Sequence, residues 1–168
     1  MQENSPYATP AADITTQNAD ETYQPQVFAT KGRIGRLRYL AYTFGSYALV
    51  GVIVAVFMAV GLADTASESM VSMIAILVMY AGMIAFGVIL SKRRLNDLDK
   101  TGWLVLALFI PIVGAFFGLY MMFASGTDGS NKYGLAPCEN PVGVKIIGLI
   151  FPIVFIIIGI VAAIALPA

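Results

Sequence analysis

Two long apolar stretches on either side of a short charged interval constrain the fold of this chain more than any other feature. Residues 70–90 and 104–124 contain no Asp, Glu, Lys, Arg or His, and residues 91–103 between them have the sequence SKRRLNDLDKTGW. An α-helix of about 20 apolar residues spans the roughly 30 Å hydrocarbon core of a bilayer. The charged interval must therefore lie at a membrane face, and the chain is predicted to be an all-α, polytopic membrane protein.

The composition agrees with this class and indicates an orientation. Only 12% of the residues are charged, whereas soluble domains carry about 25%. Eight of the ten Lys and Arg residues lie in two clusters, 31–38 and 92–100, and both clusters border apolar stretches. This placement argues against a nucleic-acid-binding surface. It predicts that both clusters face the cytoplasm, because short loops rich in Lys and Arg stay on that side.

The remaining apolar stretches complete a predicted four-transmembrane-helix bundle. The expected helices are 40–63, 70–90, 103–124 and 142–168. The first three belong to a membrane domain over residues 31–141, and the last stands as a separate fourth helix. Alternation of the four spans predicts cytoplasmic termini, with the loops 64–69 and 125–141 outside.

Two features of the third expected helix bear on its shape and packing. Pro111 removes one backbone donor in the middle of the stretch, so we expect a kink there. Gly114 and Gly118 form a G-x-x-x-G pair, a spacing that lets membrane helices approach closely. Packing within the chain is favoured over dimerisation for this pair.

The first thirty residues differ in composition from the rest of the chain. Residues 1–30 are rich in Ala, Thr, Gln, Asn and Pro, carry four acidic residues and contain no basic residue. They offer too few large apolar side chains to offset the entropy lost on ordering. We therefore expect a disordered cytoplasmic tail.

The side chains that enzymes use for catalysis are scarce. The chain has no His and a single Cys, Cys138. Its candidate titratable groups share one short interval and include no nucleophile. These groups are Arg93, Arg94, Asp97 and Asp99. The sequence therefore predicts no enzyme, no cofactor and no metal ligands, and it favours a structural ion pair or helix-end cap for Asp97 with Arg94.

The two basic clusters carry the only binding hypothesis that the residues support. The first helix starts, and the second ends, on the same membrane face, so Arg33 and Arg36 can approach Arg93 and Arg94. We expect these arginines to share Asp97 and Asp99 with phosphate groups of anionic lipid or with an acidic segment of a partner, because arginine binds carboxylate and phosphate bidentately. The alternative is that they only orient the protein in the bilayer.

Three motifs in this order resemble a known family. They are GRIGRLRY at 32–39, RRLNDLDKTGW at 93–103 and GTDGSNKYGLAP at 126–137. The combination is similar to the domain-of-unknown-function 805 family of small bacterial inner-membrane proteins, over about residues 28–137. The resemblance implies an inner-membrane location and no mechanism. It marks a structured loop, expected outside, that contains Gly126, Thr127, Gly129, Asn131, Tyr133 and Gly134.

One position departs from the family pattern, and the end of the chain carries a second resemblance. Asn96 stands where family members often have His, which argues against proton chemistry there. Residues 156–168 are similar to the membrane helix of type IV pilins, but no processing site precedes them and no glutamate lies near the start of the helix. We therefore expect a packing helix.

These observations favour a small inner-membrane interaction module that docks to a membrane partner or to anionic lipid. The alternative is an oligomeric pore or a transporter component for a small solute. The predicted spans contain no charged residue except Lys145, which lies near the start of the fourth span. This argues against an ion-coupled carrier, because such carriers keep ionisable residues inside the membrane for function. Homo-oligomerisation stays open.

Overall fold

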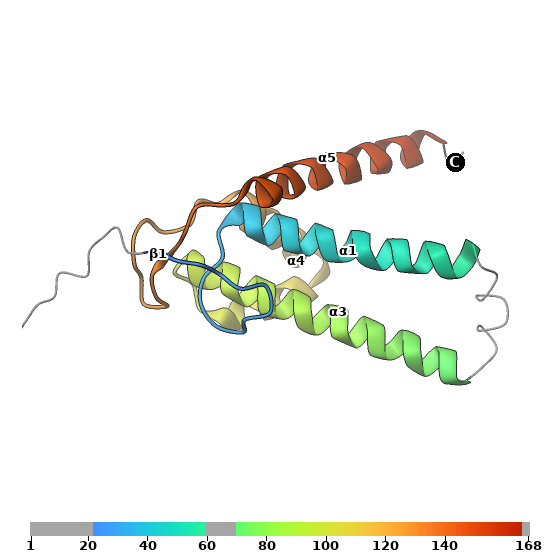
Figure 1. Ribbon diagram of the computed structural model, residues 1–168, viewed down its shortest axis with the longest axis horizontal. Helices are drawn as coiled ribbons and strands as arrows, with labels where there is room; N and C mark the ends of the chain where they lie inside the picture. Colours follow the sequence, from blue (N-terminus) through green and yellow to red (C-terminus); the bar gives the residue numbers. More distant parts are fainter. Residues whose placement is uncertain (1–21, 60–69, 166–168) are drawn as a thin grey trace, which may run out of the picture.

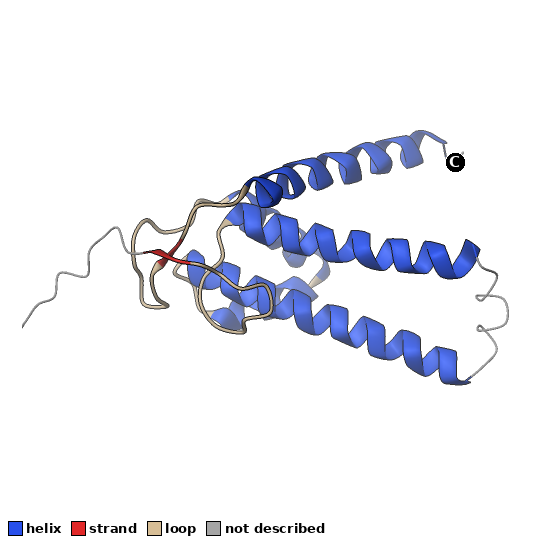
Figure 2. Ribbon diagram, in the orientation of Figure 1, coloured by secondary structure: helices blue, strands red, loops and turns tan. Residues whose placement is uncertain are grey.

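The computed structural model describes residues 22–59 and 70–165, and helices account for most of them (Figures 1 and 2). The elements are β1 (Thr22–Tyr23), α1 (Arg36–Ala59), α3 (Met70–Asp97), the 3₁₀ helix η1 (Gly102–Phe109), α4 (Pro111–Phe123), β2 (Ala136–Pro137) and α5 (Val142–Ala165). The three long helices α1, α3 and α5 extend from one polar end of the molecule and diverge toward the other (Figure 1).

The three long helices are the membrane-spanning elements of the described chain. Each is long and apolar enough to cross a bilayer, over Arg36–Phe57, Met73–Asp97 and Val142–Ala165. Within each span the most apolar 18-residue window has only 6% of its residues buried inside the molecule. A surface this apolar and this uncovered is suited to contact with lipid chains.

The expected third span, 103–124, is wrong as a continuous helix. The chain instead forms η1, breaks at Ile110 and returns as α4. η1 has eight residues and α4 has thirteen, so they extend only about 16 Å and about 20 Å and neither crosses the bilayer alone. The predicted kink at Pro111 is thus a full reversal, and Pro111 begins α4, where its missing N–H leaves no helical bond unmade.

The two halves of this hairpin pack closely. A Cβ atom added at Gly114 would lie 2.4 Å from the Leu108 carbonyl oxygen, so only glycine fits at this crossing. Gly118 is less restricted, because a Cβ atom there would lie 4.0 Å from the nearest Leu108 carbon. The predicted packing of the glycine pair within the chain is therefore confirmed at Gly114.

The hairpin determines the direction in which α5 runs. α4 ends at the same polar end where η1 began, so α5 starts beside α1 and runs parallel to it (Figure 1). The contact is close, because a Cβ atom at Gly148 would lie 2.6 Å from the Leu37 carbonyl oxygen. The expectation that loop 125–141 lies opposite the basic clusters is therefore wrong. The prediction that both ends of the chain lie on one membrane face is also wrong for the described residues, because Ala165 and Thr22 lie at opposite ends of the molecule.

The first described residues pack against this loop. β1 pairs in parallel with β2, Thr22 with Ala136 and Tyr23 with Pro137, and the Cys138 N–H donates to the Tyr23 carbonyl oxygen at 2.9 Å. The prediction of a disordered tail is thus wrong for residues 22–30. Its remainder, residues 1–21, lies outside the described residues, as do 60–69 and 166–168.

Few residues are fully buried, and they gather where the long helices meet the polar end. The buried apolar cluster contains Ile34, Tyr39, Leu90, Leu95, Leu98, Val105 and Met121. It joins α1, α3, η1 and α4 at one level, and it supports the polar residues described below.

The polar end is expected to face the cytoplasm, together with loop 125–141. In a Cys138→Ser background, Asp128→Cys places an exposed thiol in this loop. We expect a membrane-impermeant thiol reagent to label it only after the inner membrane is opened, because the ten basic residues lie at this end. Met70→Cys in the same background is the matched control at the opposite end of α3 and should be labelled in intact cells. Labelling of Asp128→Cys in intact cells would contradict the topology.

Candidate functional site

The polar end of the molecule contains all ten Lys and Arg residues of the chain. We call it the polar cap and define it as residues 22–39, 91–103 and 124–145. It is built from the chain that precedes and begins α1, the last turns of α3 with the connection into η1, and the loop that leads into α5. These three segments correspond to the three sequence motifs, which the fold brings together.

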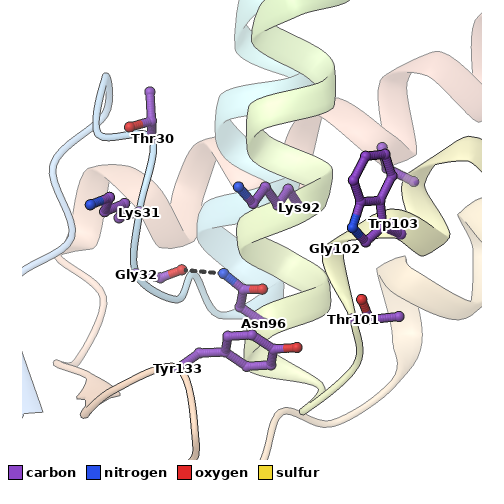
Figure 3. Close-up of a pocket in the computed structure, with 10 residues that line it drawn as sticks. Thr30, Lys31, Gly32, Lys92, Asn96, Thr101, Gly102, Trp103 and Tyr133 are labelled. Atoms are coloured by element: carbon purple, nitrogen blue, oxygen red, sulfur yellow. Dashed lines mark hydrogen bonds between the residues drawn. The ribbon is translucent and has the colours of Figure 1, made fainter.

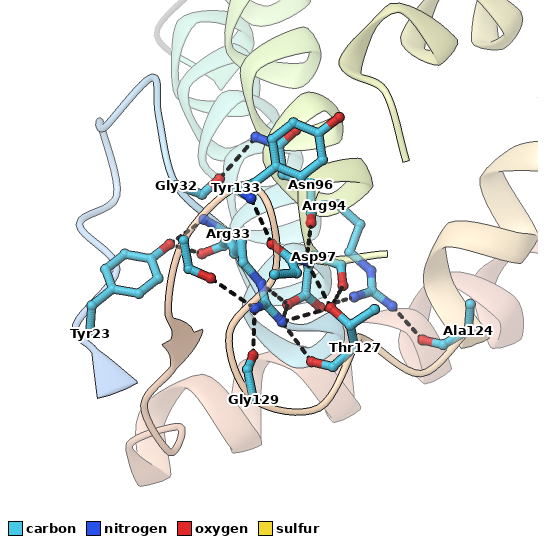
Figure 4. Close-up of polar contacts among 12 residues, drawn as sticks. Tyr23, Gly32, Arg33, Arg94, Asn96, Asp97, Ala124, Thr127, Gly129 and Tyr133 are labelled. Carbon is cyan, nitrogen blue, oxygen red and sulfur yellow. Dashed lines mark hydrogen bonds and ion pairs between the residues drawn. The ribbon is translucent and has the colours of Figure 1, made fainter. Parts of the chain in front are cut away.

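Asp97 lies at the centre of the polar cap between two buried arginines (Figure 4). Its Oδ1 atom lies 3.2 Å from Arg33 Nη2, and its Oδ2 atom lies 2.5 Å from Arg94 Nη1. Both guanidinium groups are fully buried, and the Asp97 residue is 3% exposed. We call Arg33, Arg94 and Asp97 the Asp97 cluster.

Arg33 connects the cluster to loop 125–141 through backbone carbonyl groups. Its Nη1 atom donates to the Gly129 oxygen at 2.6 Å and to the Gly134 oxygen at 3.1 Å. Its Nη2 atom donates to the Thr127 carbonyl oxygen at 2.6 Å. Gly129 and Gly134 both have positive φ angles, 63° and 124°, a conformation in which glycine is unstrained and which folds the loop around the guanidinium.

Arg94 connects the cluster to the end of the hairpin. Its Nε atom donates to the Met121 carbonyl oxygen at 2.9 Å, and its Nη2 atom donates to the Ala124 carbonyl oxygen. The last carbonyl groups of a helix have no partner within it and carry partial negative charge. Arg94 therefore caps the C-terminal end of α4 and holds it against α3.

The loop in turn caps the C-terminal end of α3. The Thr127 N–H donates to the Asp97 carbonyl oxygen at 2.8 Å, and Asn131 Nδ2 donates to the Asn96 carbonyl oxygen at 2.8 Å. Gly126 lies directly against the carboxylate, since a Cβ atom there would be 2.2 Å from Asp97 Oδ2. Within the family motif of the loop, Gly126 and Thr127 thus contact Asp97 directly, while Asn131 bonds to the neighbouring Asn96.

The structure assigns different environments to the remaining predicted site residues. Arg93 is fully buried, and its Nη1 atom donates to the Gln26 and Val27 carbonyl oxygens at 2.8 and 3.3 Å. Arg36 is exposed at the start of α1. Of the arginines expected to reach lipid phosphate, only Arg36 therefore has a free surface, while carbonyl groups and Asp97 surround Arg33.

The hydrogen bonds of Tyr23 and of Arg38 in the polar cap were not predicted from the sequence. The Tyr23 hydroxyl accepts from the Arg33 N–H and donates to the Arg33 carbonyl oxygen. Arg38 donates to Cys138 Sγ at 3.2 Å and to the Glu139 carbonyl oxygen at 2.9 Å. Composition gave no sign of the role of Tyr23, because backbone pairing with β2 and hydrogen bonds to Arg33 and Arg93 hold the segment around it.

A cavity of about 590 Å³ opens beside the Asp97 cluster (Figure 3). We call it the lysine pocket, because the exposed side chains of Lys31 and Lys92 line it. Its other lining residues include Thr30, Asn96, Thr101, Trp103, Val105 and Tyr133. Among residues 22–59 and 70–165, no three His, Cys, Asp or Glu side chains lie close enough together to hold a metal ion.

Fold and site together define a small polytopic membrane protein in which residues of three sequence motifs contact one another and hold the polar cap together. The chain belongs to the family described as protein of unknown function (DUF805), whose model matches residues 27–135. This region includes the Asp97 cluster and ends before α5. The predicted family resemblance is confirmed.

Curated relatives place the protein in the bacterial inner membrane. The chain is 33% identical to inner membrane protein YhaI of Escherichia coli (strain K12) over 107 residues, 63% of this chain and 83% of that protein. It is 35% identical to inner membrane protein YhaH of the same strain over 49 residues, 29% of this chain and 40% of that protein. No solved structure matches the chain.

Replacing Asp97 with Asn should destabilise the protein strongly. The change leaves two buried guanidinium groups without a counter-charge, which costs roughly 3–5 kcal/mol in other buried ion pairs. Asp99→Asn is the matched control, because Asp99 pairs with Lys132 at 3.5 Å with both side chains about half exposed, and such surface pairs contribute about 0–1 kcal/mol. Unfolding free energies in detergent micelles measure both. Equal effects of the two substitutions would contradict the central role of Asp97.

Arginine at position 33 should not be replaceable by lysine. An ammonium group cannot reproduce the planar fork that reaches Asp97 and the carbonyl groups of the loop at once, so we expect Arg33→Lys to cost about 2 kcal/mol or more. Arg36→Lys keeps the same charge at an exposed site and should change the unfolding free energy by less than about 0.5 kcal/mol. Similar stability of both variants would mean that position 33 needs only a positive charge.

Proposed function

We propose that this protein is a non-enzymatic interaction module of the inner membrane whose polar cap binds anionic lipid. The proposal rests on a difference in solvent exposure between the arginines and the lysines of the polar cap. Four of the five arginines are buried inside the polar cap, whereas Arg36 and all five lysines are exposed on its surface. Burial of the arginines is explained by the fold. Of the exposed lysines, Lys132 pairs with Asp99, and the other four remain available for a ligand.

The acidic residues of the described chain do not balance this surface. Asp97 is buried between arginines and Asp99 is half-buried, which leaves Asp128 and Glu139 exposed. The surface of the polar cap therefore carries an excess of positive charge at the level where the spanning helices begin. Each basic residue near an anionic leaflet contributes about 1 kcal/mol to binding, so several together give a clear preference for anionic lipid.

The same arrangement supports binding over catalysis. Asp97 is one of the candidate titratable groups of the sequence, and both oxygens of its carboxylate already pair with arginines, Oδ1 with Arg33 and Oδ2 with Arg94. The chain also has no His to act as a general base near pH 7. A protein partner with an acidic segment would meet the same lysines, and the test below separates it from lipid.

The test compares the lipids that stay with the purified protein after extraction from bilayers of phosphatidylglycerol and phosphatidylcholine. We expect phosphatidylglycerol to be enriched several-fold over the mixture supplied, and enrichment to fall with salt. Replacing all five lysines with glutamine should abolish it, while the matched lysine-to-arginine variant should keep it. A parent protein without enrichment would contradict the proposal and would favour an acidic protein segment as the ligand of these lysines.

A further inference from the structure

The lysine pocket brings together side chains from three separate stretches of the chain. Lys31 comes from the segment before α1, and Lys92 and Asn96 lie one turn apart near the end of α3. Trp103 lies at the start of η1, and Tyr133 comes from loop 125–141 (Figure 3). The pocket is thus formed only when the polar cap is assembled, and it places two cationic side chains around one cavity.

Asn96, which lines this pocket, carries a buried acceptor that the protein leaves unused. The residue is 6% exposed, and its Nδ2 atom donates to the Gly32 carbonyl oxygen at 3.2 Å. Its Oδ1 atom is buried and has no hydrogen-bond partner within the described structure. Figure 3 shows this oxygen turned away from Gly32 toward the side of the pocket where Thr101 lies. Because a buried acceptor without a donor is unfavourable, a ligand that donates there is favoured.

Two cations and one acceptor select a particular ligand chemistry. The lysines fit a group with net negative charge, and Asn96 Oδ1 fits a hydroxyl donor close to that charge. A phosphate ester that carries a free hydroxyl group has both features. The pocket volume of about 590 Å³ lies within the usual range of small-molecule sites, about 300–1,000 Å³.

The position of the pocket favours a lipid as the source of this group. Trp103 is 78% exposed at its rim, and tryptophan is enriched where membrane proteins meet lipid headgroups. A second cavity of about 540 Å³ lies between α1 and α3 and shares Val105 with the lysine pocket. Val88, which lines the second cavity, precedes Lys92 by one turn on α3, so the two cavities follow one another along this helix.

We propose that the lysine pocket binds the phosphoglycerol headgroup of a single anionic phospholipid. The phosphate lies between Lys31 and Lys92, and a headgroup hydroxyl donates to Asn96 Oδ1. One acyl chain follows α3 into the second cavity, which is lined mainly by apolar and aromatic side chains. This inference rests on the proposed function and makes it specific, since it assigns one lipid to one site within a generally basic surface.

The test is native mass spectrometry of the full chain in mild detergent, titrated with defined lipids. We expect one phosphatidylglycerol molecule to bind with higher affinity than any further molecules. The double variant Lys31→Gln/Lys92→Gln should weaken this first binding event on the order of tenfold. Lys100→Gln/Lys145→Gln removes the same charge from exposed sites outside the pocket and should leave it unchanged. Equal thermal unfolding of both variants checks their fold.

Two further ligands separate the parts of the proposal. Phosphatidylmethanol keeps the charge and lacks the hydroxyl, so it should bind more weakly, and equal binding would overturn the role of Asn96. Glycerol 3-phosphate should compete poorly, and strong competition would overturn the lipid assignment in favour of a free phosphate ester. If the parent retains anionic lipid and the pocket variant binds it equally well, this inference fails alone. Without enrichment in the parent, the proposed function fails as well.

Discussion

The structure depends on one carboxylate placed between two buried guanidinium groups. Asp97 can neutralise only one of Arg33 and Arg94, so one positive charge in the polar cap must be stabilised by dipoles. Backbone carbonyl groups provide them, from loop 125–141 around Arg33 and from the end of α4 around Arg94. The requirement to surround two buried charges therefore determines where two distant segments of the chain must lie.

This local requirement has a consequence for the whole membrane topology. Because Arg94 holds the end of α4 beside α3, the apolar stretch after α3 returns to the face where it started. The chain then has an odd number of long spanning helices in its described part, α1, α3 and α5. Lys145 at the start of α5 joins the other basic residues at one end, as the positive-inside rule favours. The buried arginines thus build the polar cap, and the exposed lysines give its surface a charge.

Much of the helical framework could be predicted from the sequence, whereas its connections could not. The expected starts at 70 and 142 agree with α3 and α5, because apolar length is a direct signal of a spanning helix. The expected end of α3 at 90 was seven residues short, since hydropathy cannot tell that Arg93 and Arg94 stay helical when buried partners surround them. The reversal at Ile110 was missed because a proline alone permits either a kink or a break.

The candidate site was predicted in part. Its residues were identified through the family motifs, and the pairing of Asp97 with Arg94 was anticipated. The partners of Arg33 could not be predicted, because they are the backbone carbonyl groups of Thr127, Gly129 and Gly134. Every residue has such a group, so the sequence does not indicate which of them bind. The lysine pocket was missed for a similar reason, since its members are far apart in sequence and only the assembled polar cap brings them together.

Hydrogen exchange of backbone amides in the parent and in Asp97→Asn tests most directly whether one carboxylate holds the polar cap together. We expect residues 32–39, 93–99 and 126–134 to lose protection together, because all three segments depend on the same buried charges. The apolar part of α5, residues 150–160, should keep its protection in detergent. Loss confined to residues 93–99, with loop 126–134 still protected, would show that Asp97 does not hold the polar cap together.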